Sequence, residues 1–296
     1  MLRAKGNTAL LMFYNLENLF YPLSSQNIDN QLRNWSLSRY QKKLKSISET
    51  LLLIQKTYGS LPIIIGVCEV QGIQPLEDLI QYPPLSSYGI IHYKGRDKRG
   101  VDTALLYDSK EIEVLHSEPL PISETRSIIF AKIQYCNSIF NVYTLHLPSR
   151  RGSDEAKNKR EIILNTLKEH LINNLNAQKE PVIILGDFNA NPNDEAIRNL
   201  MNISPRFQLI NPFSEVYANR SFSNFHRSKG LLFDQILFSE HLVSENFSLA
   251  FVKAEIFAPE QLKQHGKPSR TFAGSRYLGG QSDHFPVIIQ TKTIIN

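Results

Sequence analysis

Short runs of apolar and β-branched residues recur along the whole chain, and they constrain its fold more than any other feature. Two of these runs, Ile63-Ile64-Ile65 and Val182-Ile183-Ile184-Leu185, are apolar on both faces, as in strands that are covered on both sides. Strands are predicted at residues 10–14, 63–68, 102–107, 128–135, 139–147, 182–186, 233–238 and 285–290.

Helical patterns lie between these strands. Ser36 is placed to cap one helix, and Ser153 to cap a second that opens with Asp154 and Glu155. A third helix is predicted to begin at Asn191-Pro192, with proline at its first position. At spacings of three and four, the first helix presents Leu37, Tyr40, Leu44, Ile47, Leu51 and Ile54, and the second Ala156, Ile163, Leu167, Leu171 and Leu175.

The order of these elements indicates an α/β fold. Hairpin-like strand pairs mix with strand–helix–strand crossovers, which fits neither a purely parallel doubly wound sheet nor an all-β sandwich. Two packed sheets with helices outside fit the pattern. No repeat, linker or low-complexity segment divides the chain, so residues 1–296 are predicted to form a single domain. Two long irregular stretches, 21–35 and 258–281, are typical of functional rims or of disorder.

Composition excludes several classes of protein. Hydrophobic residues make up 42% and charged residues 21%, which excludes a disordered or collagen-like chain. Lys and Arg outnumber Asp and Glu by 33 to 28, and the net charge of +5 fits either an anionic partner or a solvated basic surface. Cys68 and Cys136 lie in apolar runs and are predicted to be buried thiols of a reducing compartment.

The same sequence contains no apolar run near the ~20 residues of a membrane span, and no signal-peptide core. We therefore expect a cytoplasmic protein without stable membrane association. No protein partner can be inferred.

Acidic, amide and imidazole side chains recur where the predicted strands begin or end. Strand ends on one edge of a sheet can converge in a cleft. Each of these residues alone fits a turn or a surface position, but together they form a matched set of oxygen ligands, imidazoles and amides. The set comprises Asn15, Glu69, His146, Asp187, Asn189, Asp283 and His284.

In this order, the motifs resemble those of the endonuclease/exonuclease/phosphatase superfamily, including its uncharacterised bacterial members. They run from near the N-terminus to near the C-terminus, so the resemblance covers essentially the whole chain. It implies a deoxyribonuclease I-like fold, a four-layer α/β/β/α sandwich of two mixed sheets with outer helices, and metal-dependent hydrolysis of phosphoesters. The matching stretches are Tyr14-Asn15-Leu16-Glu17-Asn18, Gly66-Val67-Cys68-Glu69-Val70, Leu145-His146-Leu147-Pro148-Ser149, Gly186-Asp187-Phe188-Asn189, Leu232-Phe233-Asp234-Gln235-Ile236 and Ser282-Asp283-His284-Phe285-Pro286-Val287.

The resemblance implies a metal site. Glu69 would be the principal ligand, with Asn15 and Asp283 on the metal or on its bound water. Carboxylate and amide oxygens suit Mg²⁺, whereas Zn²⁺ would recruit Cys or more His. The expected cofactor is therefore Mg²⁺, with Mn²⁺ as a substitute.

The resemblance also implies catalytic roles. Asp187 would orient or deprotonate the attacking water, and Asn189 would donate a hydrogen bond to the phosphoryl oxygen. His284 would contact the same phosphate, oriented by Asp234. His146 would act near the leaving oxygen.

Four further residues are assigned to substrate binding. Asp102 either orients His146 or is a strand-start carboxylate that faces water. Arg126 matches an arginine that touches substrate phosphate in some relatives, or is an exposed arginine without a ligand. Arg150 and Arg227 belong to basic clusters that flank the expected cleft.

These basic clusters, with Trp35, Phe222, Phe225 and Tyr277 among them, suit a nucleic-acid backbone and its bases. Solvated charges and packed rings are the alternative. Abasic-site repair relatives carry Tyr in place of His146 and tryptophans at 223–225, so that role is not favoured. Nucleic-acid phosphodiesters are the leading substrate. The alternatives are a phosphatase for small molecules or lipid headgroups, and an inactive binding module for nucleic acid or protein.

Overall fold

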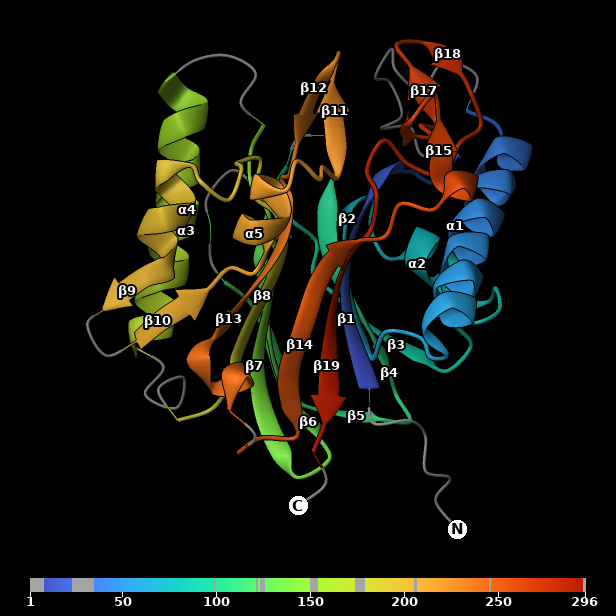
Figure 1. Cartoon of the computed structure of the whole chain (residues 1–296). Helices are drawn as coiled ribbons and strands as arrows, with labels where there is room; N and C mark the ends of the chain where they lie inside the picture. Colours follow the sequence, from blue (N-terminus) through green and yellow to red (C-terminus); the bar gives the residue numbers. More distant parts are fainter. Residues whose placement is uncertain are drawn as a thin grey trace.

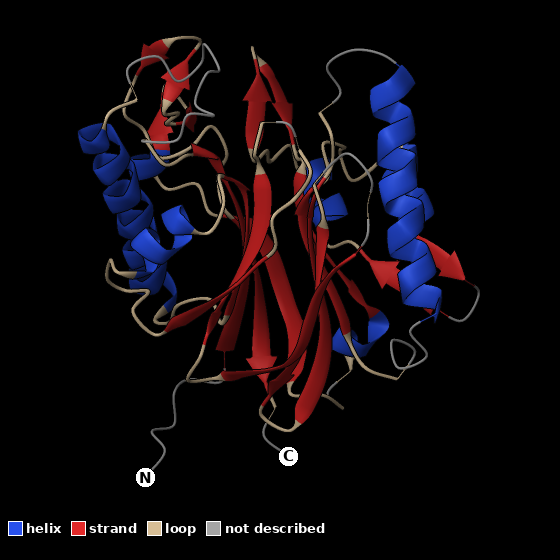
Figure 2. Ribbon diagram, turned by 180° about the vertical axis from the view of Figure 1, so that it is seen from behind, coloured by secondary structure: helices blue, strands red, loops and turns tan. Residues whose placement is uncertain are grey.

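Two large sheets pack face to face at the centre of the molecule, and helices cover their outer faces (Figure 1). The computed structural model describes residues 8–22, 35–97, 99–120, 122, 126–149, 154–173, 179–204, 207–244 and 246–294, excluding the side chains of 154–157. Seen from behind, the helices again flank the strands on both sides (Figure 2). The layers are therefore helix, sheet, sheet and helix, as the sequence predicts.

The first sheet has six strands in the described part of the chain, in the order β14-β19-β1-β2-β4-β3. β1 is parallel to β2 and antiparallel to β19, so the sheet is mixed. Its strands are β1 (Thr8–Leu19), β2 (Ile64–Val70), β3 (Tyr88–His92), β4 (Asp102–Asp108), β14 (Leu249–Ile256) and β19 (Val287–Thr293).

The second sheet has seven strands among the described residues, in the order β5-β6-β7-β8-β13-β10-β9. β7 and β8 are parallel, whereas β8 and β13 are antiparallel. Its strands are β5 (Ile112–Leu120), β6 (Ile128–Tyr135), β7 (Ser138–His146), β8 (Val182–Asp187), β9 (Asn202–Ser204), β10 (Phe207–Ile210) and β13 (Asp234–Ser239).

Alternation along the strands explains the runs that are apolar on both faces. In β1, Leu11 and Phe13 pack between the two sheets, while Leu10 and Met12 pack toward α1 (Leu37–Tyr58). Each fully buried side chain of this kind contributes about 1.5–3 kcal/mol to folding. One face of β1 thus packs against the second sheet, and the other face packs against the helix layer.

The helices lie on the two outer faces. α1 and α2 (Gln74–Ile80) cover the first sheet, and α3 (Asp154–Asn173) and α4 (Glu195–Met201) cover the second. A shorter helix, α5 (Phe213–Ala218), precedes the hairpin β11 (Asn224–His226) and β12 (Lys229–Leu231). None of the described helices has the length and apolar character needed to cross a membrane.

The late irregular stretch, residues 258–281, is folded. It contains the 3₁₀ turn η4 (Glu260–Leu262) and two short hairpins, β15 (Lys263–Gln264) with β16 (Lys267–Pro268), and β17 (Phe272–Ala273) with β18 (Arg276–Tyr277). A further 3₁₀ turn, η3 (Glu240–Val243), follows β13. Most of the other long stretch, residues 23–34, lies outside the described residues.

The structure confirms the eight predicted strands and two of the helices, with shifted ends. Ser36 caps α1, accepting a hydrogen bond from the Arg39 backbone N–H. Ser153, Ala156 and Leu175 lie outside the described side chains.

Three details of the prediction are wrong. Leu37, in the first turn of α1, is exposed, because the apolar face only meets the sheet from Tyr40 onward. Cys136 is also exposed, since it forms the turn between β6 and β7 with a positive φ of 51°. The third helix begins at Glu195 rather than at 191–192, because the Asn191 N–H is bonded to the Asp194 carboxylate (2.6 Å).

Candidate active site

Strand register in the second sheet aligns three of the expected site residues in one row. His146 at the end of β7 lies opposite Asp187 at the end of β8, and Asp187 lies opposite Asp234 at the start of β13. All three side chains are buried. His146 Nε2 is 3.7 Å from Asp187 Oδ2.

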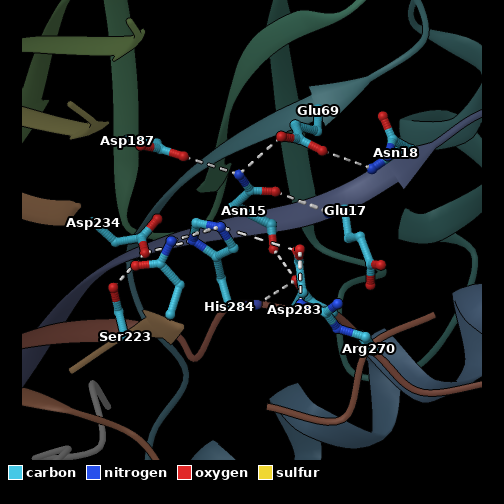
Figure 3. Close-up of polar contacts among 12 residues, drawn as sticks. Asn15, Glu17, Asn18, Glu69, Asp187, Ser223, Asp234, Arg270, Asp283 and His284 are labelled. Carbon is cyan, nitrogen blue, oxygen red and sulfur yellow. Dashed lines mark hydrogen bonds and ion pairs between the residues drawn. The ribbon is translucent and has the colours of Figure 1, made fainter. Parts of the chain in front are cut away.

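The first sheet supplies Asn15 and Glu69 to the same place (Figure 3). The Asn15 amide, at the carboxyl-end half of β1, donates from Nδ2 to Asp187 Oδ2 (3.1 Å) and to Glu69 Oε1 (3.3 Å). Its Oδ1 accepts the Glu17 backbone N–H (2.9 Å). The amide nitrogen therefore faces the carboxylates, and Asn15 joins the two sheets at the site.

Glu69 sits in a bulge of β2. Its φ of 61° is in the left-handed region, and the pairing of β2 with β4 shifts between Cys68 and Val70. Bulges of this kind redirect a side chain from its regular alternation. Glu69 Oε2 accepts the Asn18 backbone N–H (3.1 Å), so the carboxylate is held in this direction.

The segment before β19 supplies His284. Its Nδ1 is 2.6 Å from Asp234 Oδ2, which also accepts the Ser223 hydroxyl (2.6 Å). Burial alone lowers the pKa of His284, but the adjacent Asp234 carboxylate raises it, and the net pKa is well above the ordinary value. The structure thus pairs His284 with Asp234, as the resemblance implies, and favours a charged imidazole.

The pKa values of Asp187 and His146 are shifted in opposite directions from their ordinary values. Burial raises the pKa of Asp187 to about 7, with a smaller contribution from the charge of Asp234. Burial and the Arg126 guanidinium hold the pKa of His146 well below its usual range. Near neutral pH, Asp187 is thus poised to exchange a proton, whereas His146 is neutral.

Asn189 lies directly beside Asp187. Its backbone N–H donates to Asp187 Oδ1 (2.9 Å), and its Nδ2 donates to the Leu147 carbonyl (2.8 Å). Its φ of 46° places it, like Glu69, in the left-handed region. Non-glycine residues held in this way cluster at functional sites.

Asp283 lies at the edge of this cluster. Its side chain is 34% exposed, with Oδ2 3.8 Å from Arg270 Nη2 and Oδ1 3.9 Å from His284 Nε2. Asp187, Asp234 and His284 are close enough together to share a metal ion, as are Cys68, His146 and Asp187. Glu69 and Asp283 do not belong to either of these tight groups.

Asp102 does not orient His146. It is buried on β4 and its Oδ2 is 3.0 Å from His92 Nε2, while its Oδ1 accepts the Gly95 N–H (2.8 Å). Neither a contact with His146 nor a position facing water is therefore correct. The Asp102 carboxylate is paired with the imidazole of His92 on the neighbouring strand β3 and is buried.

The three arginines assigned to substrate binding lie in different environments or outside the described residues. Arg126 is buried, with Nη1 donating to the Leu147 carbonyl (3.3 Å) and Nε 3.3 Å from Asp97 Oδ2, so it is not an exposed arginine. Arg227 is exposed at the tip of the β11–β12 hairpin. Arg150 lies outside the described residues. The Trp35 ring is buried against Phe272 and Tyr277, and its Nε1–H donates a hydrogen bond to the Phe20 carbonyl.

A buried cluster that the sequence motifs did not indicate lies beside the site. Lys43 Nζ donates to the Glu17 carbonyl and to Thr271 Oγ1 (2.6 Å each), and the Glu17 carboxylate accepts the backbone N–H groups of Thr271 (2.5 Å) and Phe272 (3.2 Å). Burial and the nearby Asp283 raise the pKa of Glu17 to about 7, and burial lowers that of Lys43. A lysine next to Leu44 on the apolar face of α1 was the available signal.

Comparison with known proteins gives matches over nearly the whole chain. A family model described as "Endonuclease/Exonuclease/phosphatase family" matches residues 10–293. The comparison with curated protein sequences found no match.

Three solved structures illustrate the similarity of the backbone to that of other proteins. TDP2 from D. rerio, complexed with single-strand DNA product, has a TM-score of 0.63 at 14% identity, covering 97% of this chain and 100% of the other. The human Nocturnin catalytic domain with bound sulfate has a TM-score of 0.62 at 18% identity (97% and 95% covered). The mannosyl-6-phosphatase Bt3783 from Bacteroides thetaiotaomicron has 0.61 at 17% (96% and 99%). At these identities the likeness shows the fold.

Proposed function

The chain belongs to the endonuclease/exonuclease/phosphatase family, whose members are metal-dependent phosphoester hydrolases, and we propose that it hydrolyses phosphodiester bonds of nucleic acid. The fold is the deoxyribonuclease I-like sandwich of that family. The observation that carries the proposal is the position of Asp187. It is buried where the two sheets meet, beside Asn15, Asn189 and His146, and its pKa is raised to about 7.

Asp187 is proposed as the group that activates water. A carboxylate with a pKa near neutrality can accept a proton at working pH and release it again. Asn15 Nδ2 and the Asn189 N–H each bind one of its oxygens, so its orientation is fixed from both sides. Water held by this carboxylate would attack phosphorus in line with the leaving oxygen.

His284 and Asn189 are proposed to stabilise the phosphoryl oxygens. Positive charge and fixed N–H donors lower the barrier where negative charge develops. Asp234 keeps His284 oriented and charged, and Ser223 in turn fixes Asp234. His146, which is neutral, would serve near the leaving oxygen.

Glu69 and Asp283 are the proposed metal ligands, and Asn15, whose Nδ2 faces the carboxylates, is proposed to contact water bound to the metal. The donors of the site fit Mg²⁺ or Mn²⁺. Glu69 offers a hard carboxylate oxygen beside Asn15, and Asp283 offers one beside His284, the kind of ligand that Mg²⁺ prefers. The only nearby thiol among the described residues is Cys68, and burial raises its pKa well above the ordinary value, which disfavours the thiolate a soft metal would need. When bound, the metal supplies positive charge that neutralises the phosphoryl oxygens.

The choice of nucleic acid over a small phosphorylated molecule is supported by cationic side chains beside the site, Arg227 and Arg270 among them. TDP2, with its DNA product, and the mannosyl-6-phosphatase have nearly equal structural likeness to this chain. A phosphatase of small phosphorylated molecules is therefore the second candidate. An inactive binding module is disfavoured, because such a module has no chemical reason to keep the paired Asp234–His284 and the buried Asp187 together.

A substrate panel tests the proposal. Purified protein with Mg²⁺ or Mn²⁺ is incubated with single- and double-stranded DNA, RNA, inositol phosphates, sugar phosphates, sphingomyelin and bis-p-nitrophenyl phosphate. We expect cleavage of nucleic acid and of the synthetic diester. Turnover of phosphomonoesters alone would establish the phosphatase instead, and binding without turnover of any substrate would establish the inactive module.

A further inference from the structure

A groove of about 280 Å³ opens beside Asp283. Its walls are the β11–β12 hairpin and the β15–β16 hairpin, which lie next to each other at the upper end of the sandwich in Figure 1. The lining includes Phe225 and Arg227 from the first hairpin, Lys267 from the second, and Arg270 and Asp283. The groove is therefore continuous with the edge of the candidate active site.

The charge of the groove is predominantly positive. Its lining includes the cationic side chains of Arg227, Lys267 and Arg270 and one carboxylate, that of Asp283. Arg270 Nη2 lies 3.8 Å from Asp283 Oδ2, and both side chains are partly exposed, so the guanidinium keeps donors available to a ligand. Arginine at such a position suits planar recognition of a phosphate group.

Both walls of the groove are fixed to the segment that carries Asp283 and His284. The Phe285 N–H donates to the Ser223 carbonyl (2.7 Å), and the Ser282 N–H donates to the Ser269 carbonyl (3.2 Å). Asn224, at the base of β11, pairs directly with His284. The position of the groove relative to His284 is thus set by the backbone.

Lys267 connects the two hairpin tips. Its Nζ donates to the Arg227 carbonyl (2.7 Å) and lies 5.9 Å from the centre of the Phe225 ring. Arg227 itself has a φ of 55°, and the opposite tip turns through His265 (52°) and Gly266 (75°). These contacts hold Lys267 in place between the two tips and leave the exposed Arg227 side chain at the mouth of the groove.

We propose that this groove binds the phosphate next to the scissile one in a nucleic-acid strand, with Arg227 and Arg270 as its ligands. This inference rests on the proposed function, because a second phosphodiester next to the scissile one exists only when the substrate is a chain of phosphodiesters. A small molecule with a single phosphate would leave the groove without an anion. The groove therefore selects a polymer over a lone phosphate.

Binding in the absence of turnover tests the groove. A fluorescently labelled single-stranded oligonucleotide is titrated by anisotropy in chelator, at several salt concentrations, with wild type, Arg227→Gln, Arg270→Gln and the double variant. Each lost contact should weaken binding about threefold and flatten the slope of log Kd against log salt by about 0.7. The double variant should lose about tenfold. Arg198→Gln, an exposed arginine on α4 outside the groove, should bind as wild type.

The possible outcomes separate this inference from the proposed function. Unchanged affinity and salt slope in the groove variants would overturn the inference, as would an equal loss in Arg198→Gln, which would mean diffuse attraction. Hydrolysis of bis-p-nitrophenyl phosphate, which has no flanking phosphate, is measured in parallel with Mg²⁺. Failure of wild type to cleave it and all nucleic acids would overturn the proposed function, while the anisotropy data still decide the groove.

Discussion

Asp187 receives contacts from both sheets of the sandwich. Asn15 binds its Oδ2 from the first sheet, and Asn189, after β8 in the second, binds its Oδ1. The carboxylate is nevertheless buried with a pKa raised to about 7, because two neutral donors compensate only part of the cost of desolvation. A residue held so firmly in an unfavourable environment is better explained by chemistry than by stability.

Changing Asp187 to Asn should lower kcat on bis-p-nitrophenyl phosphate about 10²–10⁴-fold, the usual contribution of a general base. The amide preserves shape but cannot accept the proton of water. Asp108→Asn, a carboxylate at the far end of β4, should retain wild-type kcat. Circular dichroism and urea unfolding of both variants check the fold. A kcat for Asp187→Asn within twofold of wild type would contradict the assignment.

The paired His284 and Asp234 should make stability depend on pH with a definite sign. The pKa of His284 in the folded protein lies well above the ordinary value of 6.5, so its protonated form is stabilised by folding. Its contribution is fully present below pH 6.5 and is lost as pH rises through the raised pKa. The free energy of unfolding of wild type minus that of His284→Gln should therefore be largest at acidic pH.

Urea unfolding in chelator between pH 5.5 and 9 measures this difference. A difference that stays constant or grows with pH would show that His284 is not protonated by its contact with Asp234.

At the scale of elements, the ends of strands determine where the site forms. Glu17, Asn18, Glu69 and Asn189 all have positive φ, between 45° and 61°, where regular strand geometry breaks. The apolar runs predicted the strands but not these breaks, because left-handed backbone at a non-glycine residue leaves no pattern in the sequence. Edge strands were missed for a related reason. β5 and β14 have exposed residues on both faces, so they lack the continuous apolar run of a buried strand.

The late stretch that carries Arg270 is closed by a contact that only glycine allows. The Gly280 N–H donates to the Arg270 carbonyl, and a Cβ at position 280 would lie 2.0 Å from the Ser269 carbonyl oxygen. Gly280→Ala must therefore push residue 280 away from Ser269 and Arg270. We expect this shift to displace the side chains of Asp283 and Arg270. We expect kcat/KM on bis-p-nitrophenyl phosphate to fall at least tenfold.

Gly274→Ala is the matched control. Its Cβ would meet nothing within 4 Å, but its φ of 59° makes alanine unfavourable by about 1 kcal/mol. The control should lose a little stability and keep its activity. Equal kcat/KM values for the two variants would mean that the closure of the stretch does not position the site.

At the scale of the whole molecule, the site joins the first strand to the last. Asn15 lies in β1 and His284 directly precedes β19, which pair with each other. This convergence could be predicted, because Asn15, Glu69, Asp187 and the Asp283-His284 pair all lie next to the ends of strands predicted from the sequence. We propose that residues 1–296 form one domain for the same reason, since no part of the site is complete without both sheets.

Contacts that depend on which elements become neighbours could not be predicted. The pairing of Asp102 with His92 follows from β3 lying beside β4, and the burial of Arg126 follows from its contact with the Leu147 carbonyl. Lys43 reaches Thr271 only because the late stretch folds over α1. Spacing along the chain carries no information on any of these three.

Metal binding should be visible in the stability of the whole molecule. A ligand that binds only the folded state stabilises it by RT ln(1 + [L]/Kd), about 2.7 kcal/mol at one hundred times Kd. For a chain of this length, that corresponds to a rise in Tm of about 4 °C. Saturating Mg²⁺ should therefore raise the Tm of wild type relative to chelator, and restore activity that chelator removes.

Glu69→Gln distinguishes the proposed site from other sites on the surface. The variant keeps the shape of the side chain but loses the charge of the proposed principal ligand, so Mg²⁺ should raise its Tm by much less. Asp108→Asn changes the charge equally and should respond as wild type does. If Glu69→Gln gains as much Tm as wild type, the stabilising metal binds elsewhere. Because Tm is read without substrate, this result is independent of which phosphoester the enzyme cleaves.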